Sequence, residues 1–135
     1  MAALQLEVVT PNGPVVQAEA DYVGIPGELG QLGIMPGHSP LLTALVPGRL
    51  YFRKNDQNTD VFISGGFAEI SENRVSILAE SAELKEQIDV ARAQRAMDRA
   101  KQRLHSASTD DTIDVVRAEA ALLRASLRMK IASGS

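Results

Sequence analysis

The sequence has no cysteine and no tryptophan, and aromatic residues make up only 4% of its 135 residues. Without cysteine, a disulfide scaffold, a zinc site built on thiolates and a cysteine nucleophile are all excluded. The scarcity of aromatic side chains argues against a base-stacking surface for nucleic acid, and the net charge of −3 argues against a general polyanion binder. No apolar run approaches the roughly 20 residues of a membrane helix, so we expect no direct membrane insertion.

Proline and glycine are confined almost entirely to the first half of the chain. All six prolines lie at or before Pro47, nine of the ten glycines lie at or before Gly66, and neither type occurs in residues 67–133. Charge changes in the same direction. Residues 1–84 carry 4 Lys and Arg against 10 Asp and Glu, whereas residues 85–135 carry 10 against 7. We therefore predict two domains, 1–84 and 85–135.

The first predicted domain has the pattern of short strands separated by turns. Apolar and polar residues alternate at 4–8 and at 16–22, which is the period of a half-buried strand. Glycines and prolines at 27–40 suggest a surface loop. We expect a β-sandwich that includes two hairpins, formed by segments 50–52 with 61–63 and 67–70 with 75–79.

The second predicted domain has the pattern of two helices. Apolar residues recur at steps of three and four, and the polar segment 105–111 between the two series offers N-cap residues for the second helix. A short connection predicts an antiparallel helical hairpin, so the expected fold class is α+β with segregated strands and helices. The predicted buried stripes are Val90, Ala93, Met97, Ala100 and Leu104 on the first helix, and Ile113, Val116, Ala120, Leu123, Leu127 and Ile131 on the second.

Alanines in these stripes bury little surface, while both helices have high intrinsic helix propensity. Weak mutual packing between helices that are stable by themselves is typical of an element with two states. The sequence therefore favours a hairpin whose helices can separate.

Several ordered segments resemble the ε subunit of F-type ATP synthases from bacteria and photosynthetic organelles. They include Gly27–Thr43 (GELGQLGIMPGHSPLLT), Ile63–Ile70 (ISGGFAEI) and Ile88–Ala93 (IDVARA), and the resemblance covers the whole chain. It implies a non-catalytic rotor subunit of the central stalk, which is bound by the γ subunit and rests on the ring of c subunits.

The resemblance also implies a regulatory role for the helices. They would fold down against the sandwich, or extend along γ into the catalytic α/β head and block ATP hydrolysis. The location implied is peripheral, on the cytoplasmic or stromal face of an energy-transducing membrane, with the thylakoid as one candidate.

In relatives that bind ATP, the first helix begins Ile/Leu-Asp-x-x-Arg-Ala, and Ile88–Ala93 has this form. There is no P-loop, so such a site would sense ATP and not hydrolyse it. No cofactor is required and no metal site is expected. By itself, Asp89 is equally explained as a residue that favours a helix N-terminus. The ATP-binding residues that the resemblance implies are Glu83, Ile88, Asp89, Arg92, Ala93, Arg99, Arg124 and Arg128.

The arginines of the second domain form one stripe on each predicted helix. Three interpretations remain open: solvated faces with ion pairs along the helix, contacts with an acidic segment of the catalytic β subunits, or contacts with the phosphates of a nucleotide. Functions outside the rotor are a free-standing ATP-sensing protein and an enzyme, but no acid/base pair or nucleophile arrangement supports the enzyme. The expected partner contacts are Glu28, His38, Gly65, Gly66, Phe67, Arg95, Arg103 and Arg117.

Overall fold

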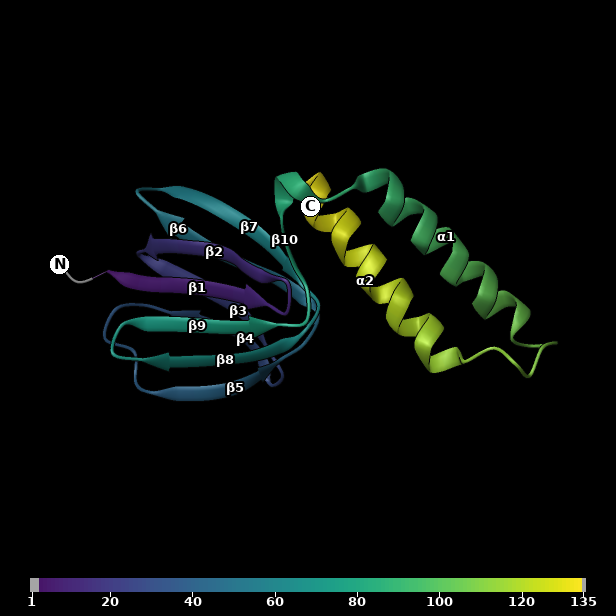
Figure 1. The fold of residues 1–135 in the computed structure, drawn as a ribbon, viewed down its shortest axis with the longest axis horizontal. Coiled ribbons are helices and arrows are strands. Elements are labelled where there is room, and N and C mark those ends of the chain that lie inside the picture. Colours follow the sequence, from purple (N-terminus) through teal and green to yellow (C-terminus); the bar gives the residue numbers. More distant parts are fainter. Residues whose placement is uncertain (1–2, 135) are drawn as a thin grey trace. The chain divides into compact units, whose positions relative to one another are not determined.

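The computed structural model describes residues 3–134, and the chain divides into two compact units, Met1–Lys85 and Glu86–Ser135. The first unit contains all of the strands and the second contains both α-helices (Figure 1). A short 3₁₀ helix, η1 (Lys85–Gln87), connects them in sequence. The division falls one residue from the predicted boundary between 84 and 85.

The first unit is a ten-stranded sheet that folds over on itself as a β-sandwich. This confirms the predicted fold class. The hydrogen-bonded order is β10-β7-β6-β3-β5-β8-β9-β1-β2, and β4 pairs with β3. The strands are β1 (Leu4–Thr10), β2 (Gly13–Ala20), β3 (Tyr22–Gly27), β4 (Gly30–Ile34), β5 (Leu41–Leu45), β6 (Gly48–Lys54), β7 (Gln57–Ile63), β8 (Gly66–Ser71), β9 (Arg74–Ala79) and β10 (Ala82–Leu84).

The core of the sandwich follows the predicted alternation. Leu4, Leu6 and Val8 of β1 are buried, and they join one cluster with the inward residues of the other strands. β1 lies between its hairpin partner β2 and β9, with which it pairs in parallel. The predicted hairpins are β6–β7 and β8–β9, and positive φ angles at residues 55–56 and 72–73 form their two-residue turns.

The predicted surface loop at 27–40 is wrong over β4, which pairs antiparallel with β3. Glycines within these strands provide space for aromatic rings. A Cβ atom on Gly24 would overlap the ring of Tyr51, and one on Gly33 would overlap that of Tyr22. The two tyrosine rings stack with their centroids 5.8 Å apart. Gly33, one of the glycines that suggest a loop, therefore marks a place where a ring lies against the backbone, as Gly24 does in β3.

The second unit is an antiparallel pair of helices, α1 (Val90–Ser106) and α2 (Val115–Ser133) (Figure 1). The side chains of Asp89 and Asp114 accept a hydrogen bond from the backbone N–H three residues later and thereby cap the two helices. The expected cap within 105–111 is wrong, because α1 continues through Ser106 and the cap of α2 lies at Asp114. Neither helix in the described part of the chain is long and apolar enough to cross a membrane.

The buried face of α1 agrees with the predicted stripe at Ala93 and Ala100, but Val90 is exposed. On α2 the predicted stripe is wrong except near its C-terminal end. Val116 is 78% exposed and Leu123 is 49% exposed, whereas Ala118 and Ala125 are buried. The two helices meet through alanines, which allow close approach of the helix axes. Val116 and Leu123, which guided the prediction, therefore lie on another face of α2.

Candidate functional site

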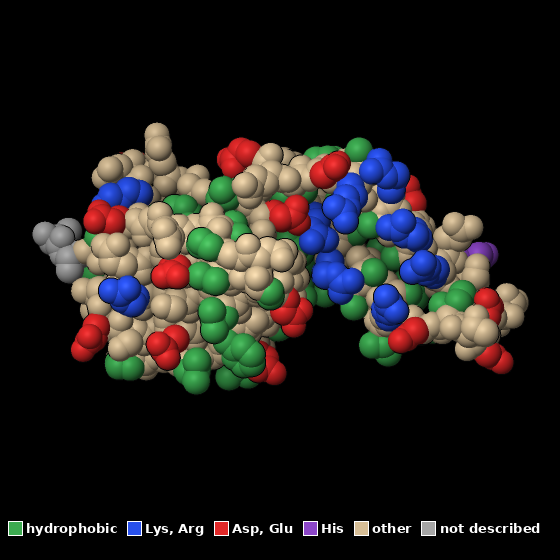
Figure 2. All heavy atoms as spheres, viewed as in Figure 1, with side chains coloured by type: hydrophobic (Ala, Val, Ile, Leu, Met, Phe, Trp, Pro, Cys, Tyr) green, Lys and Arg blue, Asp and Glu red, His purple; other side chains and the backbone are tan. Residues whose placement is uncertain are grey.

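A groove of about 240 Å³ lies between α1 and α2, and every residue that lines it is arginine or alanine. The alanines come from the faces through which the helices pack, and the arginines project from both helices around them. Figure 2 shows lysine and arginine side chains gathered on this face of the helical unit. The Arg–Ala groove is lined by Ala96, Arg99, Ala100, Arg103, Arg117, Ala118, Ala121, Arg124, Ala125 and Arg128.

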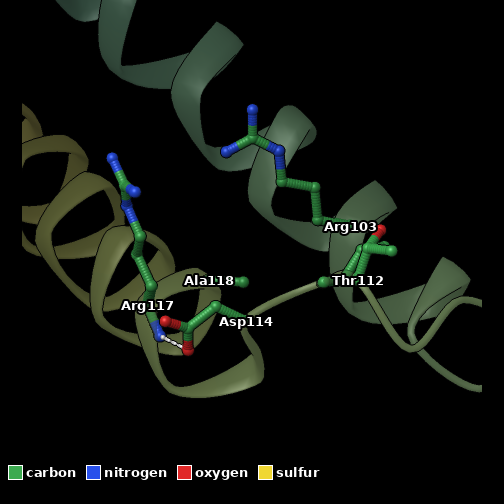
Figure 3. A pocket seen from close by; sticks show the side chains of 6 residues that line it. Arg103, Thr112, Asp114, Arg117 and Ala118 are labelled. Atoms are coloured by element: carbon green, nitrogen blue, oxygen red, sulfur yellow. Dashed lines mark hydrogen bonds between the residues drawn. The ribbon is translucent and has the colours of Figure 1, made fainter.

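A second pocket, of about 310 Å³, lies where α2 begins, and it shares Arg103, Arg117 and Ala118 with the Arg–Ala groove. Figure 3 shows Arg103 on α1 and Arg117 on α2 extending their side chains in the same direction from opposite sides of this pocket. Thr112 and Asp114 from the connecting segment also line it. Because the two cavities share these residues, they adjoin each other along the helix pair.

Most arginines of the groove form no ion pair with a carboxylate in the described part of the chain. Within residues 3–134, no carboxylate forms an ion pair with Arg99, Arg103, Arg117 or Arg124. Interpretation of the stripes as ion-paired faces is therefore wrong for these four residues. Several unpaired guanidinium groups around one groove create a positive potential, and their planar donors suit carboxylate or phosphate oxygens.

The structure brings together three of the residues expected to bind ATP, namely Arg99, Arg124 and Arg128, in the Arg–Ala groove. It adds Arg103 and Arg117, which the sequence assigned to protein partners. Arg92 and Arg95 are exposed on α1 and do not line the groove. The sequence placed the arginines on two separate stripes and did not show that five of them surround one groove.

The other residues expected to bind ATP have structural surroundings of their own. The Asp89 carboxylate accepts a 3.0 Å hydrogen bond from the backbone N–H of Arg92, so it caps α1. Ile88 and Ala93 are buried. Glu83 lies in β10 of the first unit, opposite Phe62 of β7. Their role in binding ATP stays a prediction.

The expected partner contacts of the first unit lie at two places. Glu28 lies at the exposed turn between β3 and β4, where its N–H donates to Ala44 O at 2.9 Å. His38 follows the far end of β4, in a segment that Gly37 N–H anchors to Asn73 Oδ1 at 2.7 Å. The five residues of β4 span about 17 Å, so Glu28 and His38 do not form one surface.

Gly65, Gly66 and Phe67 lie at the same end of the sandwich as Glu28, because Ala44 pairs with Phe67. Phe67 is 58% exposed and lies in register with Ala44 on one side and Leu78 on the other. Leu78 is 62% exposed and pairs in turn with Val9. Val9, Ala44, Phe67 and Leu78 thus form an apolar band across β5, β8, β9 and β1, and Figure 2 shows hydrophobic side chains gathered over β5 and β8.

The sequence did not reveal most of this band, because its residues come from four strands. Leu42, two residues before Ala44, enlarges it, and Leu29 at the turn beside Glu28 is fully exposed. Outward positions of a strand are normally polar, so apolar residues at these positions were the available signal. Such a contiguous exposed apolar surface is typical of a protein–protein contact.

Both units match known families. Residues 3–85 match the family model for the β-sandwich domain of the ATP synthase delta/epsilon chain, and residues 86–133 match the model for its long α-helix domain. The chain is 53% identical over 102 residues to the ATP synthase epsilon chain of Nitratidesulfovibrio vulgaris strain DP4, with 76% of each chain covered. It is 43% identical over 106 residues to that of Anoxybacillus flavithermus, covering 78% of this chain and 79% of the relative.

A solved structure extends this similarity. A chain in the Euglena gracilis mitochondrial ATP synthase OSCP/F1/c-ring assembly superposes with a TM-score of 0.79 at 25% identity, covering 93% of this chain and 79% of that one. The expected resemblance is therefore confirmed, whereas the comparisons give no support to a thylakoid location. From its two family domains, its relatives and its fold, the chain belongs to the epsilon-chain family of F-type ATP synthases.

Proposed function

We propose that this chain is a non-catalytic rotor subunit that links γ to the c ring in the central stalk of a proton-translocating ATP synthase. The observation that carries this proposal is the apolar band on the sandwich. Phe67 and Leu78 are large apolar side chains in register on neighbouring strands, and water faces both in the isolated chain. Burial of these side chains against γ would stabilise the assembly through the hydrophobic effect.

The neighbouring groups support a contact at the same end of the sandwich. Gly65 and Gly66 bring the chain into β8 with φ angles of +121° and +140°, which position Phe67 at the start of the band. Glu28 and Leu29 form an exposed turn there. The Euglena assembly that contains the structural relative includes F1 and the c ring, which supports placement of this chain between similar partners.

We further propose that the helical unit restrains ATP hydrolysis and that ATP favours the folded hairpin. The helices meet through alanines, so their mutual packing is weak. Within residues 3–134, four arginines of the groove have no carboxylate ion pair, so their like charges repel one another. An anion in the groove would hold them together, whereas an acidic segment of β would attract them when they extend. The chain would then be peripheral to the membrane, on the face that carries the catalytic head.

Truncation and substitution test the two parts of this proposal separately. A chain that ends at Lys85 should still bind γ, because it retains the whole sandwich, but ATPase of the reconstituted head should no longer be restrained. Phe67→Ser in the full chain should weaken binding to γ. Met35→Ser is the matched control, because Met35 is also exposed and apolar but lies beyond the far end of β4.

Three outcomes would contradict the proposal. If residues 1–85 restrained ATP hydrolysis as fully as the whole chain does, the helices would not be the inhibitory element. Equal loss of γ binding in Phe67→Ser and Met35→Ser would show that the apolar band is not the specific contact with γ. Failure of the full chain to bind γ in stoichiometric amount would favour a free-standing ATP sensor, the alternative function that the groove by itself would permit.

A further inference from the structure

We propose that the Arg–Ala groove binds an extended inorganic polyphosphate chain, which it recognises through phosphate groups alone. The inference concerns a ligand other than ATP, and it does not depend on whether the helices restrain hydrolysis. It rests on three observations: the composition of the groove lining, its length along the helices and, among the described residues 3–134, the absence of ion pairs at four of its arginines.

The lining offers no aromatic ring on which a nucleobase could stack and no hydrogen-bond acceptor side chain. It consists of five arginines and five alanines, and residues 86–135 contain no phenylalanine, tyrosine or tryptophan. Specific binding of a base normally uses stacking on aromatic rings and hydrogen bonds from precisely placed polar groups of both kinds. Guanidinium groups supply donors only, and these match phosphate oxygens.

The length of the groove favours a chain over a single triphosphate. Arg117 and Arg128 are eleven residues apart on α2, which corresponds to about 16 Å along the helix axis. Arg99 and Arg103 face this row from α1. A triphosphate group is shorter than this row and cannot lie along the whole of it. A longer chain of phosphates can contact all five arginines at once.

The alanine floor makes close contact feasible. Alanine side chains are short, so a phosphate chain can lie between the two helices while the longer arginine side chains reach it from both sides. Figure 3 shows Arg103 and Arg117 on either side of the pocket at the start of α2, with Ala118 between them. The bound chain would replace repulsion between guanidinium groups with attraction, and it would stabilise the folded hairpin because it contacts both helices.

Calorimetric titration of the full chain with long-chain polyphosphate, tripolyphosphate and ATP tests the proposal. We expect the long chain to bind at least about tenfold more tightly than tripolyphosphate, because it reaches additional charged donors. We also expect tripolyphosphate and ATP to bind about equally, since the base is not recognised. Binding of the long chain should weaken steeply with rising salt concentration, as expected when several phosphates are neutralised.

A pair of variants separates the groove from general positive charge. The double variant Arg103→Ala/Arg117→Ala should weaken binding of the long chain by about tenfold or more, with little effect on tripolyphosphate, which the remaining arginines can hold. Arg95→Ala is the control, because Arg95 is exposed on α1 and outside the groove. All altered side chains are exposed, and circular dichroism would verify that the variants remain helical.

Each contrary result would overturn the proposal. Equal affinity for the long chain and tripolyphosphate would show that the length of the groove is not used. Much tighter binding of ATP than of tripolyphosphate would show recognition of the base. Equal effects of Arg95→Ala and the double variant would show attraction to net charge only, and binding of poly-glutamate in preference to polyphosphate would assign the groove to acidic protein segments.

Discussion

Replacement of Gly66 by alanine tests whether the turn into β8 requires glycine. The φ angle of Gly66 is +140°, a conformation that residues with a Cβ atom rarely adopt. A Cβ atom there would collide with the carbonyl oxygen of Leu78 and lie 2.9 Å from Ala79 Cα. Both obstacles are backbone atoms of β9, which pairs with β8, so the strands must move apart to accept alanine.

Two costs contribute to the expected loss of stability. The unfavourable φ angle costs about 1–3 kcal/mol, and the displacement of packed backbone costs about 1–3 kcal/mol more. The free energy of unfolding of the sandwich should therefore fall by about 2–6 kcal/mol. For a unit of this size, each kcal/mol lowers Tm by about 4–8 °C, so the melting temperature should fall by at least about 8 °C.

Gly13→Ala provides a matched control for the backbone strain. Gly13 has a φ angle of +119°, but no atom beyond Gly13 and its two chain neighbours lies within 4 Å of the position of its added Cβ atom. Scanning calorimetry of both variants should therefore show the larger loss for Gly66→Ala, and the difference measures the collision with β9. Equal losses would refute the close approach of the strands, and an unchanged Tm in both would refute the argument from φ.

Three further predictions concern hydrogen bonds. Ser64→Ala should destabilise the sandwich by about 1–2 kcal/mol in urea unfolding, because Ser81 N–H loses its 2.9 Å bond to Ser64 Oγ; an unchanged midpoint would count against this. Asp114→Ala removes the cap of α2 and should lower the free energy of unfolding of the helices by about 1 kcal/mol. Thermal unfolding followed by circular dichroism measures this change, and an unchanged midpoint would contradict it. Hydrogen bonds from Thr112 hold the pKa of Asp110 below its ordinary value. The stabilisation of the connecting segment by these bonds is therefore fully present above the ordinary pKa, and it is lost as pH falls through the lowered pKa. NMR titration of Thr112→Val should show the Asp110 pKa rising toward the ordinary value, and an unchanged pKa would contradict this cause.

The sequence was sufficient for the fold class and for the strands with strict alternation. β1 and the hairpins β6–β7 and β8–β9 could be predicted because each has a clear period and a local turn. The hairpin of β3 and β4 could not, since Gly24 and Gly33 read as turn residues although they provide space for the rings of Tyr51 and Tyr22. Tyr51 comes from β6, so a local pattern does not contain its contact with Gly24.

The candidate site shows the same limit. The arginines could be identified and placed on helices, but the face of α2 that meets α1 was misjudged because alanine gives a weaker apolar signal than Val116 or Leu123. With the wrong face of α2 against α1, the sequence could not predict that the arginines of both helices line one groove. The apolar band was equally out of reach, because the register of four strands aligns Val9 with Phe67 and Ala44.

The parallel pairing of β1 with β9 has a consequence for the order of events at the ribosome. β1 is synthesised first, yet one of its edges is completed only by residues 74–79. The nascent chain therefore cannot close the sandwich until nearly the whole first unit has emerged, and until then β1 and its hairpin partner expose apolar side chains and an unpaired edge.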